Sequence, residues 1–104
     1  MAEKLEDLTV AYSEGGMATV EELDKVILSK GSWTTILFRY RDWDRAKEAW
    51  GPEKYTIRRY QKRNGEFRQQ SKFNISSRAQ AQGIVAALQT WLETEPAVST
   101  GEKS

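Results

Sequence analysis

The sequence contains no cysteine and no histidine among its 104 residues. Without thiols the chain can form neither a disulfide framework nor a thiolate nucleophile. Without imidazole it lacks the commonest metal ligand and the commonest general base. A zinc site and a hydrolase triad are therefore disfavoured. We expect no cofactor, no metal site and no catalytic residue, and we predict that the protein is not an enzyme.

Long hydrophobic runs are also missing, since no apolar stretch approaches the length of about 20 residues that crosses a membrane. The first ten residues, MAEKLEDLTV, carry acid where a secretory signal would be basic and then apolar. We therefore expect a soluble, cytoplasmic protein with no membrane partner and no small-molecule substrate. A chain of this length is expected to hold one domain with one modest core.

The net charge of +1 conceals a strong segregation along the chain. Residues 1–29 hold two lysines against seven acids, a net charge of −5. Residues 30–74 hold twelve basic residues against five acids, a net charge of +7. A local excess of this size favours a polyanionic partner, which the global balance alone would not suggest.

The segment from Trp33 to Trp43 alternates in a way that predicts a strand with two unlike faces. One parity carries Thr34, Ile36, Phe38 and Tyr40, and the other carries Trp33, Thr35, Leu37, Arg39, Arg41 and Trp43. The first set suits a hydrophobic core. The second set suits a planar or anionic ligand, because guanidinium groups and indole rings bind such groups.

Two more strands are predicted after a loop at Asp44–Glu53. Lys54–Lys62 alternates with period two, and Glu66–Ile75 does so as well. Asn64-Gly65 between them is the strongest short hairpin signal in the chain. Thr19–Leu28 is ambiguous, since it fits both an amphipathic helix with a capping box and a strand; its Val26-Ile27-Leu28 run slightly favours the strand.

The last element is predicted to be a helix after a capping box at Ser77 and Gln80. Its apolar residues recur at helical spacing, so we expect the helix to cover the sheet. The fold class is therefore predicted as α+β, with a four-stranded antiparallel sheet followed by a C-terminal helix. We expect a flexible acidic tail at residues 1–17, one domain at residues 18–94 and a second flexible tail at residues 95–104.

Sorting each strand by parity places a basic, aromatic set on the face away from the helix. This candidate nucleic-acid-binding set is Trp33, Arg39, Arg41, Trp43, Lys54, Arg58, Tyr60, Lys62, Arg68 and Lys72. Cations neutralise phosphates, and aromatic rings stack on unpaired bases for roughly 1–3 kcal/mol each. A duplex hides its base faces, so we predict a single-stranded nucleic acid as partner. The alternative is that this face only keeps the protein in solution, or that it forms a protein–protein interface, where Trp and Arg are also enriched.

The order of these segments resembles bacterial single-stranded-DNA-binding relatives of the transcriptional coactivator positive cofactor four. The resemblance covers roughly residues 23–92 and is carried by Gly31-Ser32-Trp33, Arg41-Asp42-Trp43, Lys54-Tyr55-Thr56-Ile57-Arg58 and Lys72-Phe73-Asn74-Ile75. It implies four antiparallel strands and a helix, a homodimer, and single-stranded DNA bound across the sheet. Carried over by position, the contacts would be Trp33, Trp43, Lys54, Arg58 and Lys72.

Two alternatives remain at this point. If Thr19–Leu28 is a helix, the order becomes that of a double-stranded RNA-binding domain. If the basic face meets another chain, the protein is an interaction module without nucleic acid. The expected function is a non-catalytic, homodimeric single-strand binder in transcription, replication or repair, and the choice between DNA and RNA stays open.

Overall fold

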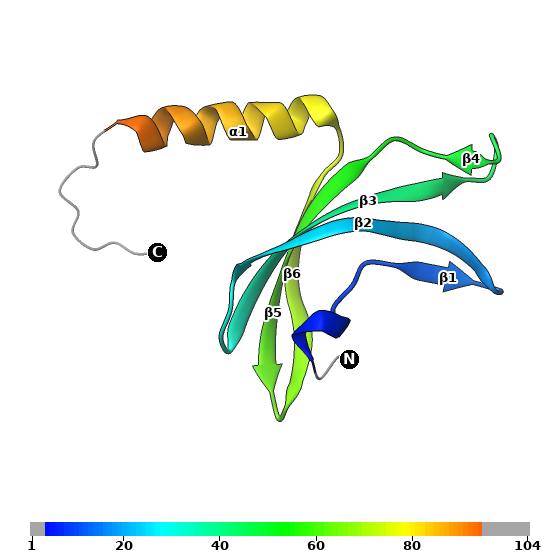
Figure 1. Ribbon diagram of the computed structural model, residues 1–104, viewed down its shortest axis with the longest axis horizontal. Coiled ribbons are helices and arrows are strands. Elements are labelled where there is room, and N and C mark those ends of the chain that lie inside the picture. Colours follow the sequence, from blue (N-terminus) through cyan, green and yellow to red (C-terminus); the bar gives the residue numbers. More distant parts are fainter. Residues whose placement is uncertain (1–3, 95–104) are drawn as a thin grey trace.

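The structure is a computed structural model that describes residues 4–94, and it contains one curled antiparallel sheet followed by one helix (Figure 1). The elements are η1 (Leu5–Asp7), β1 (Tyr12–Glu14), β2 (Met17–Ser29), β3 (Trp33–Asp44), β4 (Ala49–Trp50), β5 (Lys54–Arg63), β6 (Glu66–Ile75) and α1 (Arg78–Glu93). The sheet runs in the order β1-β2-β3-β5-β6, and β4 pairs with the end of β3. The predicted α+β class is confirmed.

The predicted count of four strands is wrong, because the sheet has six. Four are long, and the two additional strands, β1 and β4, are three and two residues long. Strands this short carry no readable alternation, so period-two analysis cannot detect them.

The ambiguous segment Thr19–Leu28 is a strand and belongs to β2. Its pairing with β3 is irregular at two places, between Glu22 and Asp24 and between Ile27 and Ser29. Each irregularity inserts one residue and breaks the period of two. Val20 and Ile27 therefore lie on the same side of the sheet although they are seven residues apart, a spacing that also fits one face of a helix.

The predicted hairpin between β5 and β6 is confirmed. Asn64 and Gly65 form its two-residue turn with φ angles of 52° and 80°, and Arg63 pairs with Glu66 on either side. Positive φ at both central residues is the geometry whose twist matches that of the flanking strands. Gly65 adopts it without strain because it has no Cβ.

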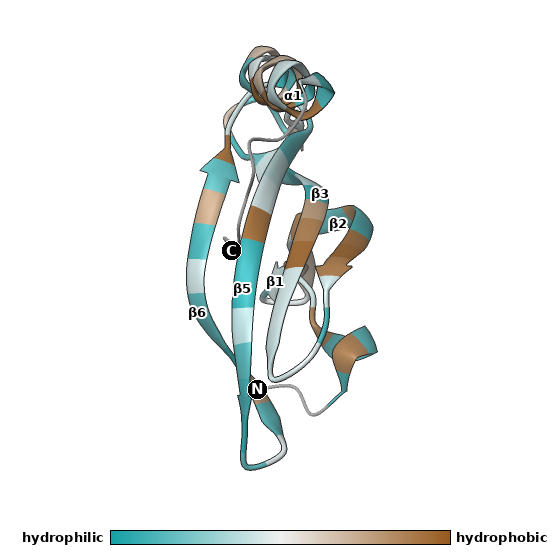
Figure 2. Cartoon of the chain, turned by 90° about the vertical axis from the view of Figure 1, so that its left-hand side faces the viewer, coloured by the Kyte–Doolittle hydropathy of each residue, from teal (hydrophilic) through white to brown (hydrophobic). Residues whose placement is uncertain are grey.

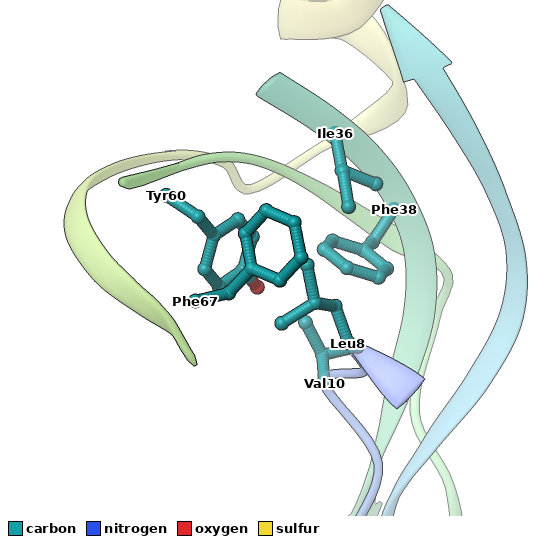
Figure 3. Close-up of a cluster of buried hydrophobic side chains, with 6 residues drawn as sticks. All are labelled: Leu8, Val10, Ile36, Phe38, Tyr60 and Phe67. Atoms are coloured by element: carbon teal, nitrogen blue, oxygen red, sulfur yellow. The ribbon is translucent and has the colours of Figure 1, made fainter. Parts of the chain in front are cut away.

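The core lies inside the curl of the sheet (Figure 3). Ile36 and Phe38 from β3 are fully buried there, with Tyr60 from β5 and Phe67 from β6. The rest of the cluster comes from the N-terminal segment, whose Leu8 is only 5% exposed and whose Val10 is also buried.

The predicted flexible tail at residues 1–17 is therefore wrong for the described part of that range. The side chain of Lys25 ties the segment to β2, because its Nζ donates to the carbonyl oxygens of Glu6 at 3.2 Å and Leu8 at 2.6 Å. Leu8 and Val10 pack against the core on this face, which α1 leaves uncovered. Residues 1–3 and the predicted tail at residues 95–104 lie outside the described part.

The expectation that the helix covers the sheet is wrong as well. α1 projects away from the sheet, and none of its residues is buried (Figure 1). The predicted N-cap is nevertheless present: Gln80 N donates to Ser77 Oγ at 3.0 Å, and Gln80 Oε1 reaches back to accept from Ser76 N, one residue before the cap, at 3.0 Å. Two residues separate β6 from α1, so these bonds set the direction in which the helix leaves the sheet.

Candidate nucleic-acid interface

The predicted contact residues lie on two faces of the sheet, not on one. We call the face that carries Ile36 and Phe38 the inner face and the opposite one the outer face. Residues paired directly across antiparallel strands share a face, and Ile36 pairs with Arg58 while Phe38 pairs with Thr56. The outer face holds Trp33, Arg39, Arg41, Trp43 and Arg68, and the inner face holds Lys54, Arg58, Tyr60, Lys62 and Lys72.

The single predicted basic face is thus wrong, and strand β6 shows why alternation could not find the division. Arg59 pairs with Ser71, but Tyr60 pairs with Gln69, so Gln70 is an extra residue at a bulge. The bulge reverses the parity of β6, so that Phe67 and Lys72 both face inward. Phe73 and Ile75 stand an even number of residues from Phe67, which in a regular strand would place all three on one face, but they face outward.

The basic residues of β3 and the first one of β5 are neutralised by acids. Arg39 pairs with Glu53 at 3.1 Å and with Asp24 at 3.9 Å. In the same way Arg41 pairs with Glu21 at 2.6 Å, and Lys54 pairs with Asp42 at 2.9 Å. The hydrogen bond to Asp42 raises the pKa of Lys54 above its ordinary value, against the desolvation that lowers it. These three cations therefore offer little uncompensated charge to a ligand.

The β5–β6 hairpin, residues 54–75, has the opposite balance. It holds seven basic residues and one acid, Glu66, and that acid pairs with Arg68 at 3.4 Å. Within residues 4–94, no acidic side chain forms an ion pair with Arg58, Arg59, Lys62 or Lys72. The uncompensated positive charge of the sheet is concentrated on this hairpin.

On the inner face of the hairpin, Arg58 and Lys72 are direct cross-strand neighbours. Arg58 Nη1 donates to Gln69 Oε1 at 3.0 Å, while its buried Nε has no acceptor among the described residues. Nearer the turn, Lys62 Nζ lies 5.2 Å from the ring centre of Phe67. Arg58 and Lys72, two neighbouring cations without an acidic partner among the described residues, form a site suited to a phosphate group.

Tyr60 belongs to the core and is not available as a stacking surface. Its side chain is only 5% exposed and packs in the same cluster as Phe38 and Phe67. Burial raises the pKa of its hydroxyl, and the neighbouring Arg58 opposes that rise. The sequence-based role of Tyr60 in base stacking therefore conflicts with its position.

On the outer face, Trp33 is exposed, and the guanidinium group of Arg59 lies over its ring. Arg59 is not among the predicted contact residues. The guanidinium carbon of Arg59 lies 4.3 Å from the ring centre of Trp33. Alternation groups Arg59 with Tyr55 and Ile57, whose apolar side chains are typical of a core face, so the sequence does not indicate Arg59 as a contact. The register with β3 puts all three on the outer face.

Trp43, at the other end of β3, is held in a packed aromatic pair. It meets Trp50 of β4 edge to face, with ring centres 5.3 Å apart and an interplanar angle of 80°. The guanidinium carbon of Arg41 lies 4.9 Å from the ring centre of Trp50. Trp43 and Arg41 therefore stabilise the β3–β4 pairing, and they lie far along the sheet from the hairpin turn.

Residues 4–94 contain no group of three or more His, Cys, Asp or Glu side chains placed to hold a metal ion. Among the same residues there is no helix long and apolar enough to cross a membrane. Neither a family model nor a curated protein nor a solved structure matches the chain.

Proposed function

We propose that the protein binds single-stranded nucleic acid, DNA in the first instance, through the β5–β6 hairpin and without catalysis. The observation that carries this proposal is the set of cations without acidic partners, Arg58, Arg59, Lys62 and Lys72, beside the exposed ring of Trp33. Capture is electrostatic, and a base then stacks on Trp33. Each phosphate contact to a single strand releases counterions, which makes the binding weaken steeply with salt.

Single-stranded ligands are favoured over duplexes for a physical reason. An indole ring gains binding energy only from an exposed base face, which a duplex does not offer. The double-stranded RNA-binding alternative required a helix at Thr19–Leu28, where the chain forms β2. The resemblance to the positive cofactor four relatives supports the single-strand proposal, because four long antiparallel strands precede the helix in this chain too.

The working form is proposed to be a homodimer formed through α1. The exposed apolar side chains of the helix are Val85, Leu88, Trp91 and Leu92, and Trp91 is 70% exposed. No charged residue occurs between Arg78 and Glu93. Interfaces between protein chains are depleted of charge in this way, whereas a solvated helix face is not.

The outer face offers a matching surface. Val26, Leu37, Ile57 and Phe73 pair in succession across β2, β3, β5 and β6, so they form one apolar row on that face. Val26 and Phe73 are each about half exposed. The exposed apolar side chains of α1 (Val85, Leu88, Trp91 and Leu92) form a stripe along the helix. Because each chain carries both this stripe and the apolar row, two copies can bury both surfaces at once in a two-fold arrangement.

Binding can be tested with the full chain by titrating tryptophan fluorescence with oligo-dT and with a duplex of equal length, at low and high salt. We expect quenching by the single strand only, and an affinity that falls steeply with salt. The matched control is Trp50→Phe, which keeps the quenching if Trp33 is the reporter. An affinity for oligo-dT that is independent of salt, or no binding at micromolar protein, would contradict the proposal.

The dimer can be tested by cross-linking, because the native chain has no cysteine. Phe73→Cys and Leu88→Cys are made in separate chains, mixed and oxidised. A mixed disulfide between the two variants is expected. Thr90→Cys, on the side of α1 opposite the stripe, is the control and should not cross-link. A disulfide formed only within a doubly substituted chain would show that the helix folds onto its own sheet.

A further inference from the structure

The uncompensated cations of the hairpin lie on both faces of the sheet at nearly the same level. Arg58 and Lys72 face inward as one cross-strand pair. Arg59 and Ser71, the next pair towards the turn, face outward. Both pairs join β5 to β6, and β6 is the edge strand of the sheet. A ligand that touches both sets must pass around that edge.

Within one chain, neither face is covered by a second layer at this level, and the row proposed for the dimer contact ends at Ile57 and Phe73, two residues from Arg59 and Ser71. On the inner face, Leu8 and Val10 pack against Tyr60 and Phe67, nearer the turn. Lys72 and its neighbours Ser71 and Asn74 are exposed. On the outer face, α1 projects away and buries none of its own residues (Figure 2). The hairpin is therefore a single-layer ribbon between the helix and the packed N-terminal segment.

The edge itself supplies further donors. An edge strand presents backbone N–H groups that no neighbouring strand accepts, and backbone N–H groups are frequent phosphate ligands. The bulge at Gln70 lies between the inward-facing Lys72 and the outward-facing Arg68. A bulge increases the local twist of a strand, so it turns the edge between the two cationic sets.

From this geometry we infer that a bound single strand crosses the edge of β6. Its phosphates contact Arg58 and Lys72 on the inner face and Arg59 on the outer face, where a base stacks on Trp33. This path rests on the proposed function and specifies the class of ligand. To touch both sets, the ligand runs from the inner face around the edge strand to the outer face, and this path spans several phosphates. The ligand must bend within that length, which an unpaired strand can do.

A duplex cannot follow this path, because its persistence length is about 150 base pairs. The proposed path therefore excludes duplexes by stiffness as well as by their hidden base faces. It also predicts that very short strands reach only one face. Length dependence thus becomes the signature that separates a crossing strand from one that stays on a single face.

The test uses the full chain and fluorescently labelled dT4 and dT12, with anisotropy measured over a salt series. Lys72→Gln removes an inner contact, Arg59→Gln removes the outer one, and Lys47→Gln in the β3–β4 turn is the matched control. With dT12, we expect each of the first two substitutions to reduce the slope of log K against log salt by about 0.7, and their effects to add. With dT4, we expect the effects of the two substitutions not to add, because so short a strand contacts only one face at a time.

The outcomes separate this inference from the proposed function. If Lys72→Gln acts on dT12 and Arg59→Gln leaves both slope and affinity unchanged, the strand keeps to the inner face and the crossing path is overturned, while single-strand binding stands. The converse result confines the strand to the outer face. If neither substitution changes binding beyond the Lys47→Gln control, the hairpin is not the site and the proposed function fails with it.

Discussion

Ile36 and Arg58 face each other across β3 and β5 on the same side of the sheet. One is fully buried, and the other keeps an unpartnered Nε at the border of the same core. The hydrophobic core and part of the basic surface therefore share the inner face. Lys72, the cross-strand neighbour of Arg58, is exposed and lies on the edge strand β6, so the basic surface runs from the border of the core to the edge of the sheet.

The N-terminal segment contributes to stability through Leu8. We expect Leu8→Ala to lower the free energy of unfolding by about 2–5 kcal/mol, because it removes a buried side chain and leaves a cavity. Urea denaturation measures the loss. Met17→Ala, at an exposed position on β2, is the control and should change stability by about 0.5 kcal/mol or less. Equal stability of both variants would mean that residues 1–17 are the dispensable tail that their composition suggests.

Neutralised and free cations should differ in their contribution to binding. We expect Lys72→Gln to weaken oligo-dT binding several-fold at low salt, because it removes an uncompensated charge. Arg41→Gln should weaken binding less than twofold, since Glu21 already neutralises Arg41. Anisotropy titrations at one fixed low salt concentration compare the two. A larger loss for Arg41→Gln would move the binding surface to β3.

The two tryptophans of β3 should separate function from stability. Trp33→Ala is expected to lower single-strand affinity by about 1–3 kcal/mol, through the loss of base stacking, and to leave the fold intact. Trp43→Ala is expected to lower thermal stability instead, because its edge-to-face contact with Trp50 is lost. Circular dichroism melts and binding titrations on both variants give the comparison. The reverse pattern would identify Trp43 as the ligand contact.

Stability should fall at alkaline pH. The folded-state pKa of Tyr60 is raised above its ordinary value of 10.0, mainly by burial. The contribution of this raised pKa to the free energy of unfolding is complete below the ordinary value of 10.0. It is lost as pH rises through the folded-state pKa, because the unfolded chain releases the proton first. Lys54, whose pKa is also raised, acts in the same direction.

Urea denaturation between pH 8 and about 11 tests this dependence. Tyr60→Phe should flatten the alkaline decline, and Tyr12→Phe, at an exposed tyrosine, should leave it unchanged. A decline that is identical in the wild type and Tyr60→Phe would rule out burial of the hydroxyl as its cause.

Local features of the fold could be read from the sequence because they depend on neighbouring residues. Asn64-Gly65 predicts a tight hairpin turn, Ser77 with Gln80 predicts the start of the helix, and the alternation from Trp33 predicts β3. The face of each strand could not be read in this way. Alternation shows which residues of a strand share a side, but not which sides of two strands coincide.

The candidate site shows the same division. The sequence located the positive charge between residues 30 and 74 through composition, and it pointed to Trp33, Arg58 and Lys72 through alternation and the family resemblance. It could not show that Arg39, Arg41 and Lys54 are neutralised, because their acidic partners are 12 to 20 residues away in sequence. It also missed Arg59, whose parity matches that of two apolar neighbours.

The sequence by itself determined the α+β class, the hairpin turn, the capped helix and the segregation of charge, since propensity, turn chemistry and composition are local properties. Only the tertiary structure decided which charges remain uncompensated, which face Arg58 and Lys72 occupy, and that Leu8 rather than the helix completes the core. Those properties depend on the register between strands. The bulge at Gln70 reverses the faces of β6, and the direction set at Ser77 carries α1 away from the sheet.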